Sequence, residues 1–127
     1  MSSSGFAEKR RHQRVENSIP LKISAADADF VTESRNISCS GVYCKVDKYL
    51  EPMTKLNILL LLPIRKGNKI TTKKISCGGV VVRTENILND EGFNAAIFFN
   101  DIHARDSRAL AEYVENAAAG QKPAVSA

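Results

Sequence analysis

Residues 54–71 read TKLNILLLLPIRKGNKIT and indicate the fold class most directly. The centre of the first half is apolar at every position, as expected for a strand that is buried on both faces within a sheet or barrel. The Gly-Asn pair after it is a typical turn, and the β-branched run KKISCGGVVVRTE follows at residues 73–85. Its paired glycines, Gly78 and Gly79, suggest a bulge or a sharp bend. This segment therefore predicts two strands joined by a turn.

Four further segments have the composition and alternation of strands, and turn-like connections separate them. They are IPLKIS at 19–24, FVTESRNIS at 30–38, GVYCKV at 41–46 and GFNAAIFFND at 92–101. Six short strands at fairly regular spacing predict a mainly β fold, a small antiparallel β-barrel or sandwich. From residue 100 the apolar spacing becomes helical. This predicts one C-terminal α-helix over residues 102–118, with Asp101 as its N-cap and Gly120 as its stop.

Length and composition indicate a single domain. The chain has 127 residues, of which 43% are hydrophobic, and this suits one compact domain with its own core. We expect flexible ends at residues 1–7 and 119–127, where the sequence is small and polar. Between them we expect a domain at 8–118, with a basic arm at 8–16 and a barrel at 19–99.

The net charge is small and is concentrated near the N-terminus. The 18 Lys and Arg residues exceed the 14 Asp and Glu residues, which gives a net charge of +4, and the arm sequence EKRRHQR carries most of the excess. A protein that grips long duplex DNA spreads basic residues over a whole face, because each neutralised phosphate adds to affinity. We therefore interpret the charge as a local feature of the arm.

The apolar runs and the cysteines suggest a cytoplasmic protein. The basic arm leads into VENSIPLKIS and not into the apolar run of a secretory signal. The longest apolar run, ILLLLPI, is far shorter than the roughly 20 residues that cross a bilayer, so no membrane partner is expected. Cys39, Cys44 and Cys77 are an odd number without a CxxC pair. We expect free, mostly buried thiols, with neither a disulfide framework nor a metal site.

The segment RNISCSGVY contains Asn36, Ser38 and Gly41 at the spacing NxSxxG. An amide offers directional donors and an acceptor, a hydroxyl can bond a phosphate or a ribose, and glycine allows a positive φ or close approach of a ligand. The same residue types are common in ordinary β-turns, so this spacing taken alone also has a purely structural explanation.

Upstream of this turn, Arg10 and Arg14 form an RxxxR pair in the basic arm. RxxxR followed by NxSxxG at the head of a β-rich chain resembles the PilZ domain family, whose members are receptors for the bacterial second messenger cyclic di-GMP. The resemblance extends from Glu8 to the terminal helix and includes the GGVVVR and GFNAAIFF strands. The chain has Asn36 where many members of the family carry Asp.

The resemblance implies a six-stranded antiparallel β-barrel with a C-terminal helix, which binds cyclic di-GMP on its outer surface and needs no cofactor. Guanidinium groups suit this ligand, because their planar fork pairs with phosphate or with the O6 and N7 atoms of guanine. The implied ligand-binding residues are Arg10, Arg11, Arg14, Asn36, Ser38 and Gly41, and the possible further ones are Lys9, Ser40 and Arg83.

A receptor of this kind would act through ordering of the arm, which changes a surface presented to an effector protein. The processes that such a receptor controls in this family include motility and biofilm formation.

Three other functions compete with a receptor. An enzyme is not expected, because neither His12 nor His103 adjoins a catalytic partner in sequence. A barrel that binds nucleic-acid polymers needs aromatic stacking platforms, whereas only 6% of the residues are aromatic, and Phe98 and Phe99 are expected within a core strand. A ligand-independent PilZ-type adaptor is the main alternative, although such members generally lack one or both motifs.

Overall fold

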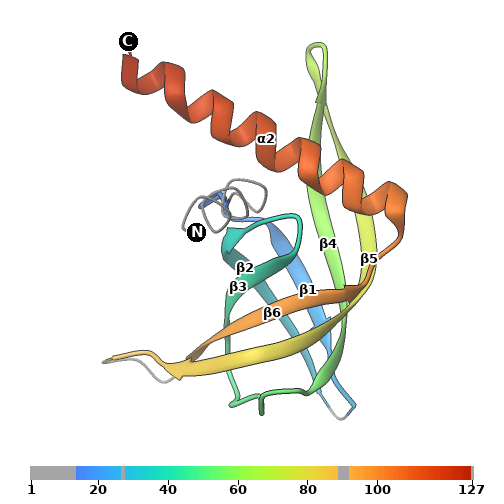
Figure 1. The fold of residues 1–127 in the computed structure, drawn as a ribbon, viewed down its shortest axis with the longest axis vertical. Helices are drawn as coiled ribbons and strands as arrows, with labels where there is room; N and C mark the ends of the chain where they lie inside the picture. The colour runs from blue at the N-terminus through green and yellow to red at the C-terminus, as the bar shows by residue number, and fades with distance from the viewer. Residues whose placement is uncertain (1–13, 27, 89–91, 127) are drawn as a thin grey trace, which may run out of the picture.

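The computed structural model describes residues 14–26, 28–88 and 92–126, with side chains to residue 119. This part of the chain forms antiparallel strands and a C-terminal helix (Figure 1). The strands are β1 (Pro20–Ser24), β2 (Asp29–Ile37), β3 (Gly41–Val46), β4 (Lys55–Lys66), β5 (Lys69–Asn86) and β6 (Phe93–Asp101), and the helix is α2 (Ala104–Ser126).

The strands close into a barrel in the order β1-β2-β3-β6-β5-β4. All six strands and the antiparallel barrel are therefore confirmed. The β4–β5 hairpin runs from the pair Lys55–Val80 to the pair Lys66–Lys69 and turns at Gly67, which has a φ of 61°. Glycine adopts this left-handed conformation without a Cβ clash, which explains why the chain reverses there.

Aliphatic side chains from every strand fill the interior of the barrel. Leu60, Leu62 and Ile75 are fully buried within it. Helix α2 lies across one end of the barrel and adds Leu110 and Val114 to the same core (Figure 1). Full burial of a leucine contributes about 1.5–3 kcal/mol, so the apolar stripe of the helix attaches it to the barrel.

The ends of helix α2 differ from the prediction. Asp101 is the last residue of β6 and is paired in the sheet, so its assignment as the N-cap was wrong. The amide of Ser107 instead bonds the carbonyl of His103 at 2.8 Å, which starts the helix two residues later. The helix also continues through Gly120, because one glycine weakens a helix by only about 1 kcal/mol. Within the described residues, no helix is both long and apolar enough to span a bilayer.

Strand alternation places the two neighbouring phenylalanines of β6 on opposite faces. Phe99 is 5% exposed and lies in the core, whereas Phe98 is 49% exposed. Both residues belong to a strand of the barrel, as expected, but only Phe99 contributes to the core, since successive side chains of a strand point to opposite sides.

Cys44 and Cys77 are free, buried thiols, as expected. Burial raises the pKa of the Cys44 thiol to about 12 and that of the Cys77 thiol to about 11. Both thiols are therefore protonated at neutral pH, and they act as small apolar side chains in the core.

Candidate functional site

Two β-bulges aim polar side chains at the outer face of the barrel. In β2, Ser34 faces inward, but the register shifts after it, so the next inward residue is Ile37 and Asn36 points outward. In β5, a second shift after Val81 reverses the alternation in the same way and turns Arg83 outward. Bulges frequently re-aim side chains beside functional sites.

The two re-aimed residues lie in one row that crosses four strands. Asn36 of β2 pairs with Tyr43 of β3, Tyr43 pairs with Ala96 of β6, and Ala96 pairs with Arg83 of β5. Glu85 lies two residues beyond Arg83 on the same face. Because Ala96 is small, the longer side chains on either side of it can meet above it.

Arg14 joins this row from the segment before β1. An isolated bridge between Val15 and Ile37 fixes the segment through two backbone hydrogen bonds of 3.0 and 2.9 Å. Val15 is itself buried in the core, at 2% exposure. This anchor places the Arg14 side chain over β2, where its Nη1 donates a hydrogen bond of 2.6 Å to Oδ1 of Asn36.

The electrostatic surroundings of Arg14 favour an anion. Partial burial and the positive charge of Arg83 both lower the pKa of Arg14, which remains protonated because the pKa of a guanidinium is so high. Among the residues that the structure describes, no carboxylate forms an ion pair with Arg14. Two like charges that approach each other without a shared counterion form a site that a bound anion would stabilise.

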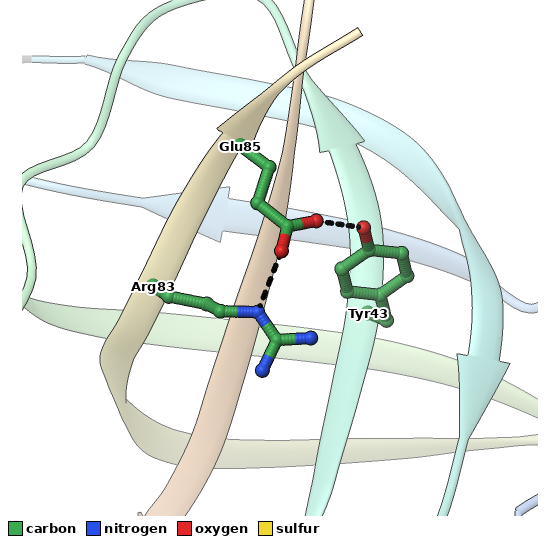
Figure 2. A network of polar contacts seen from close by, with 3 residues as sticks. All are labelled: Tyr43, Arg83 and Glu85. Atoms are coloured by element: carbon green, nitrogen blue, oxygen red, sulfur yellow. Dashed lines mark hydrogen bonds and ion pairs between the residues drawn. The ribbon is translucent and has the colours of Figure 1, made fainter.

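Arg83 belongs to a polar network that Figure 2 shows in close-up. Its Nε donates to Oε2 of Glu85 at 2.9 Å, and the hydroxyl of Tyr43 donates to Oε1 at 2.7 Å. The hydrogen bond to the carboxylate raises the pKa of Tyr43, and the same bond lowers the pKa of Glu85. Because the ion pair is made through Nε, both terminal nitrogens of Arg83 are clear of the carboxylate (Figure 2).

The turn between β2 and β3 uses the remaining residues of NxSxxG for its own structure. The Ser38 side chain is fully buried, and its Oγ accepts a hydrogen bond from the amide of Ser40 at 3.1 Å. Gly41 has no positive φ. A Cβ at this position would lie 2.4 Å from the carbonyl oxygen of Ile97 in β6, so glycine allows the two strands to pair closely.

A groove adjoins the row on the β2 side, and its volume is about 700 Å³. Asn36 and Tyr43 belong to both the row and the groove, and the charged residues of the groove are Glu16, Glu33, Arg35 and Lys45. The lining of the groove therefore has no net charge, and an anion is attracted instead to the Arg14 and Arg83 side.

The sequence profile of the PilZ domain matches residues 8–116. The chain belongs to the PilZ domain family. This family consists of cyclic di-GMP receptors and adaptors.

Among solved structures, the chain is similar to the Bacillus subtilis inhibitor of motility MotI/DgrA, with a TM-score of 0.74 and 23% sequence identity. The similarity covers 84% of this chain and 50% of that one, so the chain spans half the length of MotI/DgrA. At this identity the likeness shows a shared fold. No curated protein matches the sequence.

The structure brings the two PilZ motifs together through Arg14 and Asn36, which are 22 residues apart in sequence. Arg83 lies in the same row of side chains, and Ser40 is partly exposed in the turn. Ser38 and Gly41 are adjacent to the row, but their side-chain positions are explained by the turn and the sheet. Three predicted residues lie outside the described residues: Lys9, Arg10 and Arg11.

Sequence reasoning missed two polar residues on the outer face beside Arg14 and Asn36, namely Tyr43 and Glu85. Tyr43 was identifiable as an outward position, because it alternates with buried residues in GVYCKV directly after the NxSxxG turn. Glu85 gave no such signal, since the bulge after Val81 changes which residues of β5 face outward.

Proposed function

We propose that this PilZ domain is a receptor for cyclic di-GMP that acts as an adaptor for an effector protein. Membership of a family of cyclic di-GMP receptors supports the choice of ligand. In this proposal, Arg10, Arg14 and Arg83 bind the phosphodiester and guanine groups, with Arg11 and Lys9 as neighbouring cations. The ligand is an intracellular second messenger, so we place the protein in the cytoplasm.

The observation that carries the proposal is the approach of Arg14 and Arg83 on the outer face. The charge of Arg83 lowers the pKa of Arg14, and no carboxylate among the described residues pairs with Arg14. Cyclic di-GMP has two phosphodiester charges, and each guanidinium presents a planar fork of donors. A phosphodiester between the two arginines would replace their mutual repulsion with two charge-assisted contacts.

Asn36 supports the site by holding Arg14. Its Oδ1 accepts one N–H of the guanidinium, which orients the group and leaves other donors for the ligand. Ser40 can add a hydroxyl contact from the turn, while Ser38 and Gly41 maintain the shape of that turn. The motif thus contributes both contacts and structure.

In this proposal, the signal is transferred through the arm. The RxxxR pair spans residues 10–14, and Val15 attaches the end of this segment to β2. We propose that ligand binding orders residues 8–14 over the barrel and so changes the surface available to an effector. Ordering costs about 1–2 kcal/mol per residue in backbone entropy, so the ligand contacts must exceed that total.

Calorimetric titration with cyclic di-GMP tests the receptor, with GTP and single-stranded RNA as control ligands. We expect selective, saturable binding to the parent protein. Arg14→Ala should weaken binding by about tenfold or more, since a charge-assisted hydrogen bond contributes about 1.5–3 kcal/mol. Arg14→Lys should also weaken it, because lysine keeps the charge but loses the fork. The matched control is Arg105→Ala on the exposed face of α2. Parental affinity in Arg14→Ala would refute the site.

A ligand-independent adaptor is the second candidate, and one observation favours it. Ser38 and Gly41 have structural roles without any ligand, so the NxSxxG residues do not by themselves require one. Absence of heat with cyclic di-GMP, GTP and RNA alike would support this candidate over the receptor.

A further inference from the structure

The β4–β5 hairpin extends beyond the barrel. β1 pairs with β4 only as far as Leu60, and β6 pairs with β5 only from Gly78 onward. Residues 61–66 and 69–77 therefore pair only with each other in the sheet. Helix α2 crosses the part that contains the buried residues Leu62 and Ile75, and the tip of the hairpin projects beyond the helix (Figure 1).

This projection is strongly basic. Residues 65–74, RKGNKITTKK, include five cations and no acid, so the interpretation of the charge as a feature of the arm alone was wrong. The sum over the chain concealed this second cluster, because acidic residues elsewhere offset it. Lys73 pairs with Asp106 at 3.7 Å. Within the described residues, Arg65, Lys66 and Lys69 have no ion-pair partner.

A groove of about 640 Å³ separates the hairpin from helix α2. On the hairpin side it is lined by Ile64 and Ile70, with Arg65 and Lys66 beside them. Ile70 is 62% exposed, which is a large exposure for an isoleucine that faces a concave surface. Exposed apolar side chains with cations beside them are typical of a surface that binds another molecule.

The helix side of this groove has the spacing of a helix-packing face. Its lining residues are Ala109, Glu112, Tyr113, Asn116 and Ala117, at i, i+3, i+4, i+7 and i+8. The two alanines are small and lie eight residues apart, which is about 12 Å along the axis. Small residues at both ends of such a face let a second helix approach closely.

We propose that the groove between the β4–β5 hairpin and α2 docks an amphipathic helix of a partner protein that carries acidic side chains. Its apolar side chains would contact Ile64 and Ile70, and its acidic side chains would pair with Arg65, Lys66 and Lys69. This inference rests on the proposed adaptor role, but it does not require cyclic di-GMP.

Charge and shape favour this occupant over others. Arg65 and Lys66 line the groove, Lys69 follows in the hairpin, and Glu112 on the helix wall is acidic. The cations are therefore on the hairpin side, where they complement acidic side chains of a partner, which increases association rate and specificity. Pro63 in β4 has no N–H to donate, so addition of an extended strand at this edge would lack a hydrogen bond. Lysines also protect exposed strand edges from aggregation, but that role does not explain the exposed Ile70 beside the groove. A flat lipid surface would not reach the floor of a concave groove.

The groove is connected to the segment that follows Arg14. Asn17 lines one end of it, three residues after Arg14, and its Nδ2 donates a hydrogen bond of 2.6 Å to the hydroxyl of Tyr113. The segment that carries Arg14 therefore also contacts the helical wall of the docking surface.

The test uses the full chain without nucleotide and a fluorescent synthetic peptide of about 18 residues, with leucines at i, i+3, i+4 and i+7 and glutamates on both flanks. We expect saturable binding by fluorescence anisotropy. The variant Lys66→Glu with Lys69→Glu should bind at least about tenfold more weakly. The control, Lys48→Glu with Lys55→Glu, changes exposed lysines before and at the start of β4, far from the hairpin tip, and should bind like the parent.

A peptide of the same composition in scrambled order should not bind. A peptide with lysines in place of the glutamates should bind more tightly to Lys66→Glu with Lys69→Glu than to the parent. Equal binding of the scrambled peptide, or parental affinity in Lys66→Glu with Lys69→Glu, would overturn the proposal. So would binding of phosphatidylglycerol vesicles or single-stranded RNA through these lysines when the peptide does not bind. Titration of the same protein with cyclic di-GMP reports separately on the proposed receptor function.

Discussion

Gly41 offers a direct test of whether the NxSxxG motif acts through the sheet. An alanine Cβ at this position would lie 2.4 Å from the carbonyl oxygen of Ile97, about 0.6 Å inside the closest approach that Cβ atoms make. The obstacle is backbone, and the adjacent bond from the amide of Phe99 to the carbonyl of Ser40 (2.9 Å) opposes its movement. Overpacking lowers the free energy of unfolding by about 1–3 kcal/mol, and we expect the loss in Gly41→Ala to be near the upper end of this range.

This cost converts into a measurable change in melting temperature. The entropy of unfolding is about 2.1 cal/mol/K per residue, or about 0.27 kcal/mol/K for this chain. A loss of about 3 kcal/mol should therefore lower the Tm by about 11 °C in scanning calorimetry. The matched control is Gly67→Asn, where φ is 61° and no atom lies within 4 Å of a Cβ. Asn tolerates that conformation, so its Tm should fall by less than about 4 °C.

A Gly41→Ala variant that keeps its Tm would assign a different role to this glycine. If Gly41→Ala melts within about 2 °C of the parent protein but no longer binds cyclic di-GMP, the glycine serves approach of the ligand and not strand pairing. The sheet-based explanation of the motif would then be refuted.

Two further predictions concern the ligand. Glu85→Gln removes the carboxylate that pairs with Arg83 and takes a negative charge from the ligand face, so calorimetry should show binding about threefold tighter. Weaker binding would instead mean that Glu85 contacts the ligand. Hydrogen exchange in residues 7–15 should slow when cyclic di-GMP is added, with the β4–β5 hairpin as internal reference. Unchanged exchange in saturated protein would contradict ordering of the arm.

Local patterns in the sequence were sufficient to predict the strands, because the alternation of strands and the residue types of turns are short-range properties. The β3 strand matches its prediction, GVYCKV, at both ends. The start of the helix was not predicted, since Asp101 has the side chain of an N-cap but is held by pairing with Gly78. That pairing connects residues far apart in sequence and leaves no local signal.

The candidate site was predicted in part. The sequence placed Arg14 and Asn36 in one site by resemblance to the PilZ family, and they form a hydrogen bond. It did not indicate the Tyr43–Glu85 bond or the approach of Arg83 to Arg14. These contacts depend on which face of a strand each residue occupies.

The sequence by itself therefore determined the six strands, the terminal helix and the two motifs that resemble the PilZ family, since each depends on residue types at short spacing, whereas the barrel was chosen over a sandwich only through that resemblance. Only the tertiary structure decided which polar residues share a surface. A single extra residue in β2, and another in β5, reverses the alternation of inward and outward side chains and so brings Asn36 and Arg83 to the same outer face. The groove beside the basic hairpin also depends on the tertiary structure, because its two walls come together only when α2 packs across the end of the barrel.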